Sequence, residues 1–247
     1  MAIFEATNLH KRFGDQVVLE NISLSFEANQ LSGIMGPNGA GKSTCFNVLT
    51  GHYTPDGGRV MFDGRDITGL PPRKIASLGI SRSFQIMNLF DEFTAIQNIL
   101  IALPDSVSRC FNPFHDIANN DEAMDRAETV LARVGLAGRE LSLAGSLPYG
   151  ERRALEIGVA LASDPRLLFL DEPTQGLGAD GTALLAELIT ELRQSYTIVV
   201  IEHDMKFLFA LADVISVIHW GQVIASGSPD QLRANEWVQA SSLGEIG

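Results

Sequence analysis

The stretch from residue 36 to residue 44 constrains the fold of this chain more than any other. It fits the pattern GxxxxGK[ST], with an apolar run over residues 31–35 before it and a helical apolar pattern after it. Glycines let backbone N–H groups curl around a polyphosphate, and the following helix directs the positive end of its dipole at the same charge. The residues of this phosphate loop are Gly36, Pro37, Asn38, Gly39, Ala40, Gly41, Lys42, Ser43 and Thr44.

Three side chains of the phosphate loop have predicted tasks. Lys42 is expected to contact the β- and γ-phosphates of a bound nucleotide. Ser43 is expected to supply a hydroxyl ligand for Mg²⁺, with Thr44 capping or packing beside it. The alternative is a glycine-rich turn that only joins a strand to a helix. The complete motif, placed between an apolar strand and a helix, favours phosphate binding over that alternative.

Composition excludes several classes of protein. The chain has 247 residues, of which 45% are hydrophobic and 19% charged, as in ordinary globular proteins. No apolar run approaches the ~18 residues that span a bilayer, and the first residues lack the layout of a signal peptide, so a cytoplasmic location is expected. The net charge of −12 argues against a nucleic-acid partner and against adsorption to an anionic membrane. Cys45 and Cys110 have neither disulfide nor metal-site spacing.

The N-terminal segment has the pattern of a small antiparallel layer. From Ile3 to Gln30, short alternating runs are broken by turn residues, and a hairpin pattern follows over residues 57–64. Phe13 lies just before one of the turns. Its ring either stacks on an adenine base or is a half-buried strand residue, and the pattern alone does not decide between the two.

The middle of the chain predicts a helical lobe inserted into an α/β domain. Residues 80–85 have a strand pattern that ends in Gln85. From about residue 89 to residue 161 the pattern is helical, apart from a loop-rich stretch over residues 104–120. We therefore expect one domain, with an α/β core over residues 1–88 and 162–247 and a helical lobe over residues 89–161. Met87, Phe90 and Phe93 are interpreted as lobe core, with a groove for a partner helix as the alternative.

Two buried strands are predicted to deliver polar side chains to one edge of a parallel sheet. The run over residues 167–170 is apolar without alternation and leads into Asp171 and Glu172; a similar run over residues 198–201 leads to His203. Ligands bind at the carboxyl ends of parallel strands. We therefore expect Asp171 to hold Mg²⁺, Glu172 to act as general base on a water molecule and His203 to contact the γ-phosphate. A helix-capping pair and a structural histidine are the alternatives. The helix between these strands has the apolar stripe Leu184, Leu185, Leu188, Ile189 and Leu192.

Together these segments resemble, over essentially the whole chain, the ATP-binding subunits of ABC transporters. The matching features in chain order are Phe13, the phosphate loop, Gln85, a signature segment over residues 147–151, Asp171 with Glu172, and His203. Residues 149–157 and 202–205 further resemble the branched-chain or hydrophobic amino acid uptake group. The resemblance implies the ABC ATPase fold: a P-loop NTPase core of the RecA-like type with a mostly parallel sheet, a small antiparallel β layer and an inserted helical lobe.

The resemblance also implies a mechanism and partners. Two ATPase subunits, identical or related, would form a head-to-tail dimer. Each ATP would lie between the phosphate loop of one subunit and Gly150 in the signature segment of the other. Gln85 would sense the γ-phosphate and bind Mg²⁺, joining Lys42, Glu172 and His203 in the catalytic set. The helical lobe would receive a cytoplasmic helix of a membrane permease. ATP binding and hydrolysis would then power import with a periplasmic binding protein, from the cytoplasmic face of the inner membrane.

Two positions depart from the family's pattern. Pro148 stands where a serine is usual, so a hydroxyl contact to the opposite γ-phosphate is absent. A hydrogen bond to a charged group is worth roughly 1.5–3 kcal/mol, so we expect weaker ATP-driven closure of the dimer. Proline suits the first turn of a helix, which leaves Gly150 and the helix dipole facing the phosphate. Gly178 stands where an aspartate is common, which bears on communication between the two sites.

Two other functions fit the same ATPase site. One is the energising subunit of a lipopolysaccharide exporter, which would work with export permeases instead of a binding protein. The other is a non-transport member of the family, such as an iron–sulfur assembly or nucleic-acid repair factor. The acidic balance disfavours the nucleic-acid version. The transported substrate is not encoded in this chain, because in this family the permease and the binding protein select it.

Overall fold

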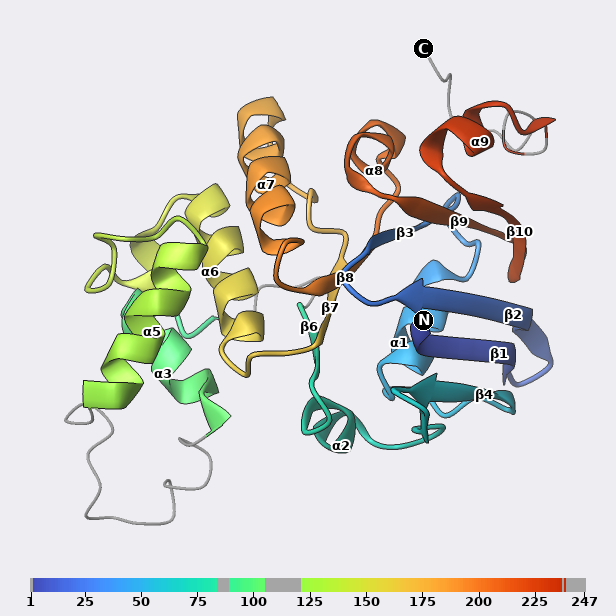
Figure 1. Cartoon of the computed structure of the whole chain (residues 1–247), viewed down its shortest axis with the longest axis horizontal. Coiled ribbons are helices and arrows are strands. Elements are labelled where there is room, and N and C mark those ends of the chain that lie inside the picture. Colours follow the sequence, from blue (N-terminus) through green and yellow to red (C-terminus); the bar gives the residue numbers. More distant parts are fainter. Residues whose placement is uncertain (1, 84–88, 105–120, 237, 239–247) are drawn as a thin grey trace.

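An antiparallel sheet and a mostly parallel sheet organise the computed structural model, which describes residues 2–83, 89–104, 121–236 and 238 (Figure 1). The antiparallel sheet has the strand order β2-β1-β4-β5, formed by Ala2–Phe13 (β1), Gln16–Glu27 (β2), Gly57–Phe62 (β4) and Arg65–Asp66 (β5). β1 pairs antiparallel with both β2 and β4. The predicted antiparallel layer and its hairpin are thereby confirmed.

The second sheet has the order β10-β9-β3-β8-β7-β6. Its strands are Leu31–Met35 (β3), Ile80–Arg82 (β6), Leu167–Asp171 (β7), Thr197–Ile201 (β8), Val214–His219 (β9) and Gln222–Gly227 (β10). All neighbouring pairs are parallel except β9 and β10. Every residue of β3, β7 and β8 is buried, because both faces of the sheet centre are covered.

The helices gather in distinct places around this sheet. They are Lys42–Leu49 (α1), Pro72–Ala76 (α2), Ala95–Ala102 (α3), Asp121–Arg133 (α5), Tyr149–Leu161 (α6), Ala179–Leu192 (α7), Met205–Leu211 (α8) and Pro229–Arg233 (α9), with a 3-10 turn at Ala144–Ser146. Helices α3, α5 and α6 lie together on one side of the molecule, away from β1, β2 and β4 (Figure 1). This group matches the expected helical lobe, while its predicted limits at residues 89 and 161 stay a prediction.

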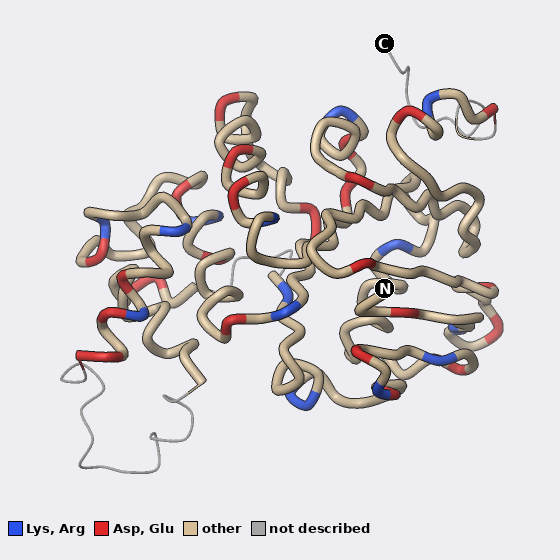
Figure 2. Tube along the Cα trace, viewed as in Figure 1, with Lys and Arg blue, Asp and Glu red and all other residues tan. Residues whose placement is uncertain are grey.

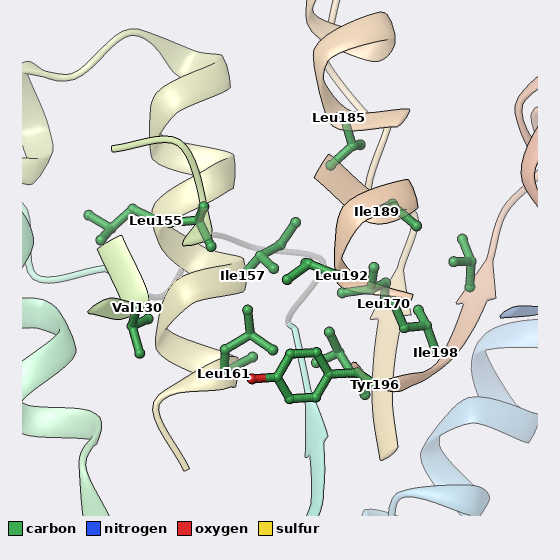
Figure 3. Packing of buried hydrophobic residues seen from close by; sticks show 14 of the residues in the cluster. Val130, Leu155, Ile157, Leu161, Leu170, Leu185, Ile189, Leu192, Tyr196 and Ile198 are labelled. Carbon is green, nitrogen blue, oxygen red and sulfur yellow. The ribbon is translucent and has the colours of Figure 1, made fainter. Parts of the chain in front are cut away.

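Two hydrophobic cores lie on the two faces of the parallel sheet. Successive strand residues alternate between them: Leu168 and Leu170 join the core shared with α3, α5, α6, α7 and α8, whereas Leu167 and Phe169 join the core under the antiparallel sheet and α1. Figure 3 shows part of the first core, in which side chains of α6 and α7 meet Leu170 and Ile198 of the sheet. The strands thus separate a helical side from an antiparallel-sheet side.

The apolar stripe predicted for α7 is partly wrong. Leu185, Ile189 and Leu192 are buried and point into the core in Figure 3, but Leu184 is 67% exposed. Positions i, i+4 and i+7 define the buried stripe of a helix, and a residue next to the stripe in sequence lies about 100° around the helix axis. Leu184 therefore faces away from the core.

The interpretation of Phe90 and Phe93 as lobe core is also wrong. Their rings stack on each other with centroids 5.4 Å apart, and they are 56% and 40% exposed. The buried side chain of Asn98 holds this loop, accepting a hydrogen bond from the N–H of Phe90 at 2.9 Å and donating to carbonyl oxygens of the same loop. The aliphatic side chains of α3 fill the core in their place. Met87 lies outside the described residues.

The charged surface and the buried thiol of Cys45 fit what the composition predicts. Acidic side chains outnumber basic ones by 30 to 18, and Figure 2 shows lysines and arginines distributed over several elements. No helix within the described ranges has the length and apolarity needed to cross a membrane. Cys45 is fully buried, and burial raises the pKa of its thiol to about 12, so it packs as an apolar residue. Cys110 lies outside the described residues.

Candidate nucleotide site

Three neighbouring strands end at the same edge of the parallel sheet. In the register of the sheet, Ile34 on β3 and Asp171 on β7 both lie opposite Ile201 on β8. The segments that leave these strand ends are the phosphate loop, the loop that begins with Glu172 and the loop that begins with Glu202. The fold thus brings together the motifs that the sequence predicted at one edge.

Close backbone packing shapes the phosphate loop. A Cβ atom on Gly36 would come 2.1 Å from the carbonyl oxygen of Ile218, so only glycine fits there. Gly39 and Gly41 have φ angles of +80° and +100°, which glycine adopts without strain. Helix α1 begins directly after Gly41, and no side chain caps its first N–H groups, which suits an anion. Around these glycines, Pro37 is half-buried, Asn38 exposed and Ala40 buried.

Lys42 is folded back over the phosphate loop. Its Nζ donates hydrogen bonds to the carbonyl oxygens of Gly36 at 2.8 Å and Pro37 at 3.1 Å, and the residue is only 6% exposed. Burial lowers the pKa of Lys42, and the three carboxylates at the same sheet edge oppose this shift. Ser43 is exposed and Thr44 half-buried. The loop therefore presents an ammonium group and an accessible hydroxyl at one helix start.

Phe13 lies in a hairpin that packs against the phosphate loop. The carbonyl oxygen of Val18 lies 3.0 Å from the point where a Cβ atom on Gly41 would stand. The ring of Phe13 is 45% exposed and forms a T-shaped pair with the Tyr53 ring, with centroids 5.3 Å apart. The ammonium group of Lys11 lies 5.4 Å from the centroid of the Phe13 ring. An exposed aromatic ring, in a hairpin that contacts the phosphate loop, has the chemistry to stack on a base.

The two carboxylates at the end of β7 have different surroundings. Asp171 is 6% exposed, and burial raises its pKa to about 6, while the charge of Arg82 opposes the shift. The side chain of Glu172 is 15% exposed, and its backbone lies in the left-handed region with φ of +42°. The N–H of Glu172 donates to the carbonyl oxygen of Ile201 at 2.8 Å. Asp171 is therefore the deeper group and Glu172 the one nearer to solvent.

His203 lies beside two carboxylates at the end of β8. Its Nδ1 atom is 3.9 Å from Oε1 of Glu172 and 3.5 Å from Oε2 of Glu202, and its side chain is 54% exposed. Among the described residues no group of three or more histidine, cysteine or acidic side chains is arranged to hold a metal ion. Gln85, the remaining predicted γ-phosphate and Mg²⁺ contact, lies outside the described residues.

Gly150 belongs to a helix that packs on the other face of the sheet from α1. It lies in the first turn of α6, which packs in the helical core, whereas α1 packs in the core under the antiparallel sheet (Figure 1). A Cβ atom on Gly150 would meet nothing within 4 Å. Pro148 occupies the N-cap of α6 and offers no side-chain cap, so the first N–H groups of this helix lack a side-chain partner at the cap.

Comparison with known proteins identifies the family of this site. Residues 19–175 match the family model described as ABC transporter. The chain belongs to the ABC transporter ATP-binding family. It is 41% identical to the high-affinity branched-chain amino acid transport ATP-binding protein BraF of Pseudomonas aeruginosa. The corresponding protein LivG of Escherichia coli K12 is 39% identical, and each match covers 98% of both chains.

Two further matches bear on fold and function. A crystal structure of an ABC transporter ATP-binding cassette in its ADP conformation superposes with a TM-score of 0.88, at 30% identity over 99% of this chain and 100% of the other. The lipopolysaccharide export ATP-binding protein LptB of Haemophilus influenzae is 29% identical over 99% of this chain and 98% of its own. The chain is thus an ABC ATPase: a nucleotide-binding, ATP-hydrolysing subunit of an ABC transporter.

Sequence reasoning missed the role of Glu202 in this ABC ATPase. Glu202 is fully buried, and its carboxylate accepts hydrogen bonds from the N–H and hydroxyl of Thr174 and from the N–H groups of His203 at 2.9 Å and Asp204 at 3.3 Å. A buried carboxylate needs such donors, and here they fasten the loop after β7 to the loop after β8. The available signal was a glutamate placed directly after the apolar run over residues 198–201.

Sequence reasoning also missed Arg153, which connects α6 of the ABC ATPase to the end of β7. The side chain is 2% exposed, pairs with Glu156 and donates to three successive backbone carbonyl oxygens, from the last residue of β7 onward. The signal that could have found it is periodicity. Arg153 and Glu156 lie on the same helical face as Ile157, which predicts two buried charges in contact.

Proposed function

We propose that this ABC ATPase energises the uptake of branched-chain or other hydrophobic amino acids. One observation carries the proposal: 39–41% identity over 98% of the chain to two proteins whose names give branched-chain amino acid transport. The lipopolysaccharide export relative, which represents the main alternative, is 29% identical. The gap in identity favours import, and with it a permease and a periplasmic binding protein that select the substrate.

The phosphate loop and Asp171 fit Mg²⁺ with ATP in this proposal. Lys42 exchanges its two carbonyl partners for the β- and γ-phosphates, and the ring of Phe13 stacks on the adenine. Ser43 and Asp171 offer hard oxygen donors. Burial raises the pKa of Asp171, and a cation would offset the cost of burying its charged carboxylate. Held by these oxygens, Mg²⁺ would supply positive charge that offsets the negative charge of the phosphates. Gln85 is retained as a third predicted ligand.

Glu172 and His203 complete the proposed catalytic set. Glu172 accepts a proton from the attacking water, and its partly exposed carboxylate at the sheet edge is accessible for this task. His203, 3.9 Å from the Glu172 carboxylate, contacts the γ-phosphate. General base catalysis of this kind contributes roughly 10²–10⁴-fold to a rate.

A second ATPase subunit completes the proposed site. Gly150 and the first N–H groups of α6 are open to contact from outside the chain, which supports a head-to-tail dimer with a copy of this chain or a related ATPase. The N-cap proline offers no hydroxyl to the opposite γ-phosphate, so closure depends on backbone N–H groups and the helix dipole.

The stacked rings of Phe90 and Phe93 form the proposed docking surface for the permease. They are large, exposed and held in place by Asn98, which is the arrangement expected of a preformed contact for a cytoplasmic helix. In this arrangement the ATPase lies peripherally on the cytoplasmic face of the inner membrane.

Affinity purification from mildly solubilised membranes tests the partners. We expect the tagged chain to recover one or two multi-pass permease subunits, with or without a second ATPase. The double variant Phe90→Ser, Phe93→Ser should lose the permease but keep ATP binding, because the rings are exposed and their loop is held by Asn98 rather than by the phosphate loop. Leu184→Ser is the matched control, since Leu184 is 67% exposed on α7 and should keep the permease.

Reconstitution tests the substrate class. The recovered complex, placed in proteoliposomes with its binding protein, should import radiolabelled leucine, isoleucine or valine only when ATP is supplied inside. Recovery of export permeases, or only of non-membrane assembly proteins, would overturn the uptake proposal while leaving the ATPase assignment intact.

A further inference from the structure

Arg153 makes an unusual set of contacts for a buried cation. Its Nη2 atom donates to the carbonyl oxygens of Asp171 and Glu172, both at 3.0 Å, and its Nε donates to the carbonyl oxygen of Pro173 at 3.2 Å. Its Nη1 atom pairs with the buried carboxylate of Glu156 at 2.5 Å. One guanidinium on α6 therefore holds three successive peptide carbonyls, and two of these belong to Asp171, the predicted Mg²⁺ ligand, and Glu172, the predicted general base.

Stability alone does not account for this arrangement. A buried ion pair contributes little net stability compared with apolar side chains of similar volume, because both charges lose their hydration. What arginine supplies is geometry, since its planar fork presents five donors in fixed directions. A lysine keeps the charge but concentrates its donors on one nitrogen atom and cannot reach three carbonyls in the same way. The contacts of Arg153 thus define the course of the backbone after β7.

The backbone at Glu172 requires such support. Its φ of +42° lies in a region that costs energy for any residue with a side chain. The N–H of Glu172 is held by the carbonyl oxygen of Ile201 on β8 at 2.8 Å, and its carbonyl oxygen is held by Arg153 on α6. The peptide groups on either side of the Glu172 side chain are therefore fixed by two different elements, one from the sheet and one from the helical group.

A second residue of α6, Tyr149, bonds to the same loop. The hydroxyl of Tyr149 donates to the carbonyl oxygen of Gln175 at 2.9 Å. Gly176 packs against the hydroxyl end of this ring, because a Cβ atom there would come 2.7 Å from the hydroxyl oxygen. Tyr149 and Arg153 are four residues apart and so lie on the same face of the helix. The beginning of α6 thus holds the loop at both ends of the segment 171–175.

We propose that Arg153 is a positioning residue that sets the orientation of Glu172, with Tyr149 as its weaker assistant. Through these contacts the signature helix and the general base behave as one unit, so the placement of α6 determines whether Glu172 can reach the attacking water. The inference rests on the proposed role of Glu172. It assigns a catalytic consequence to α6, a helix that packs in the helical core.

The test separates turnover from binding in the full-length chain. ATP affinity and the fraction of binding-competent protein are measured by titration with a fluorescent ATP analogue, and ATPase rates are then divided by that fraction. We expect Arg153→Lys to lower kcat per competent site at least tenfold while the dissociation constant for the analogue stays within twofold. A purely structural role would lower the competent fraction and leave kcat per competent site unchanged, which would overturn the inference.

A matched control and a milder variant accompany Arg153→Lys. Arg193→Lys is the control, because Arg193 also joins a carboxylate, Asp213, and a carbonyl oxygen, that of Leu211, away from this edge of the sheet. It should leave kcat per competent site unchanged. Tyr149→Phe removes one hydroxyl from a half-exposed ring and should lower kcat per site two- to threefold. If Arg153→Lys does not fold, this variant decides, and an unchanged kcat overturns the inference.

A parallel Glu172→Gln variant separates the two levels of the argument. If Glu172→Gln retains wild-type turnover, the proposed role of Glu172 fails and the inference fails with it. If Glu172→Gln is inactive while Arg153→Lys and Tyr149→Phe turn over normally, only the positioning role is wrong. Neither outcome depends on the permease or on the transported substrate.

Discussion

The phosphate loop after β3 and the carboxylate loop after β7 lie at the same sheet edge but are held in different ways. In the phosphate loop, side-chain hydrogen bonds are local: Lys42 reaches carbonyl oxygens five and six residues before it. In the carboxylate loop, the side-chain hydrogen bonds come from residues distant in sequence. Arg153 bonds to residues 18 to 20 positions away, and Glu202 to a residue 28 positions away. One loop is shaped by its own glycines and the other by side chains that the fold delivers.

This difference teaches where each half of the site is sensitive. Substitutions within the phosphate loop should damage nucleotide binding and folding together, because its glycines both shape the phosphate site and pack closely against the backbone of Ile218 and Val18. Substitutions around the carboxylate loop should separate binding from turnover, because its supports belong to α6 and β8 rather than to the phosphate contacts. Three variants test that contrast, in order of expected effect.

Glu172→Gln should give the largest effect, and only on turnover. Removing a general base costs roughly 10²–10⁴-fold in rate, equivalent to about 3–5 kcal/mol. ATP affinity should be retained, and the ATP-bound dimer should accumulate because hydrolysis no longer separates it. Steady-state ATPase assays and size-exclusion chromatography with ATP are the measurements. A variant that hydrolyses ATP at the wild-type rate would remove Glu172 from the mechanism.

Gly36→Ala should damage folding and binding together. The new methyl group would stand 2.1 Å from the carbonyl oxygen of Ile218, and that oxygen belongs to a buried strand. We expect a loss of at least about 3 kcal/mol in the free energy of unfolding, measured by urea denaturation, together with loss of ATP binding. Gly39→Ala is the control: its φ of +80° is strained, but nothing lies within 4 Å, so the loss should be about 1 kcal/mol. Equal losses would contradict the packing argument.

Asp171→Asn should stabilise the nucleotide-free chain. Burial raises the pKa of Asp171 from 3.8 to about 6, so the folded state binds this proton more tightly than the unfolded chain. The charged carboxylate therefore destabilises the fold, by nothing below about pH 4, increasingly up to pH 6, and constantly above. We expect a gain of about 1–3 kcal/mol at pH 7.5 and almost none at pH 4, from urea unfolding at both pH values. An equal gain at both would exclude this titration as the cause.

The sequence predicted the edge of the sheet well because its signals are local. The phosphate motif, the apolar runs before Asp171 and His203, and the hairpin patterns each occupy a few consecutive residues, and the structure places them as expected. Contacts between distant segments carry no such signal. Nothing in the sequence near Asp171 announces that a guanidinium from α6 will bind its carbonyl oxygen, and Glu202 becomes meaningful only when Thr174 is seen beside it.

Exposure of apolar side chains was the other point at which prediction failed. Helical spacing and aromatic clustering describe which residues are apolar, but not which of them find a partner within the chain. Leu184 and the pair Phe90 and Phe93 satisfy the patterns of a core yet remain exposed. The pattern of α7 is wider than the face that packs, and Asn98 ties the loop of the aromatic pair outside the core.

The strand order has a consequence for how the protein is made. β3 lies between β8 and β9, so the strand that leads into the phosphate loop lacks its β8 neighbour until residue 201 and its β9 neighbour until residue 219 has been synthesised. The antiparallel sheet is complete by residue 66 and can form early, whereas these long-range pairings form late and slowly. The close contact between Gly36 and the backbone of Ile218 cannot form before Ile218 has been synthesised. Unfinished or truncated chains therefore lack a formed nucleotide site. ATP binds only completed chains and so stabilises them selectively.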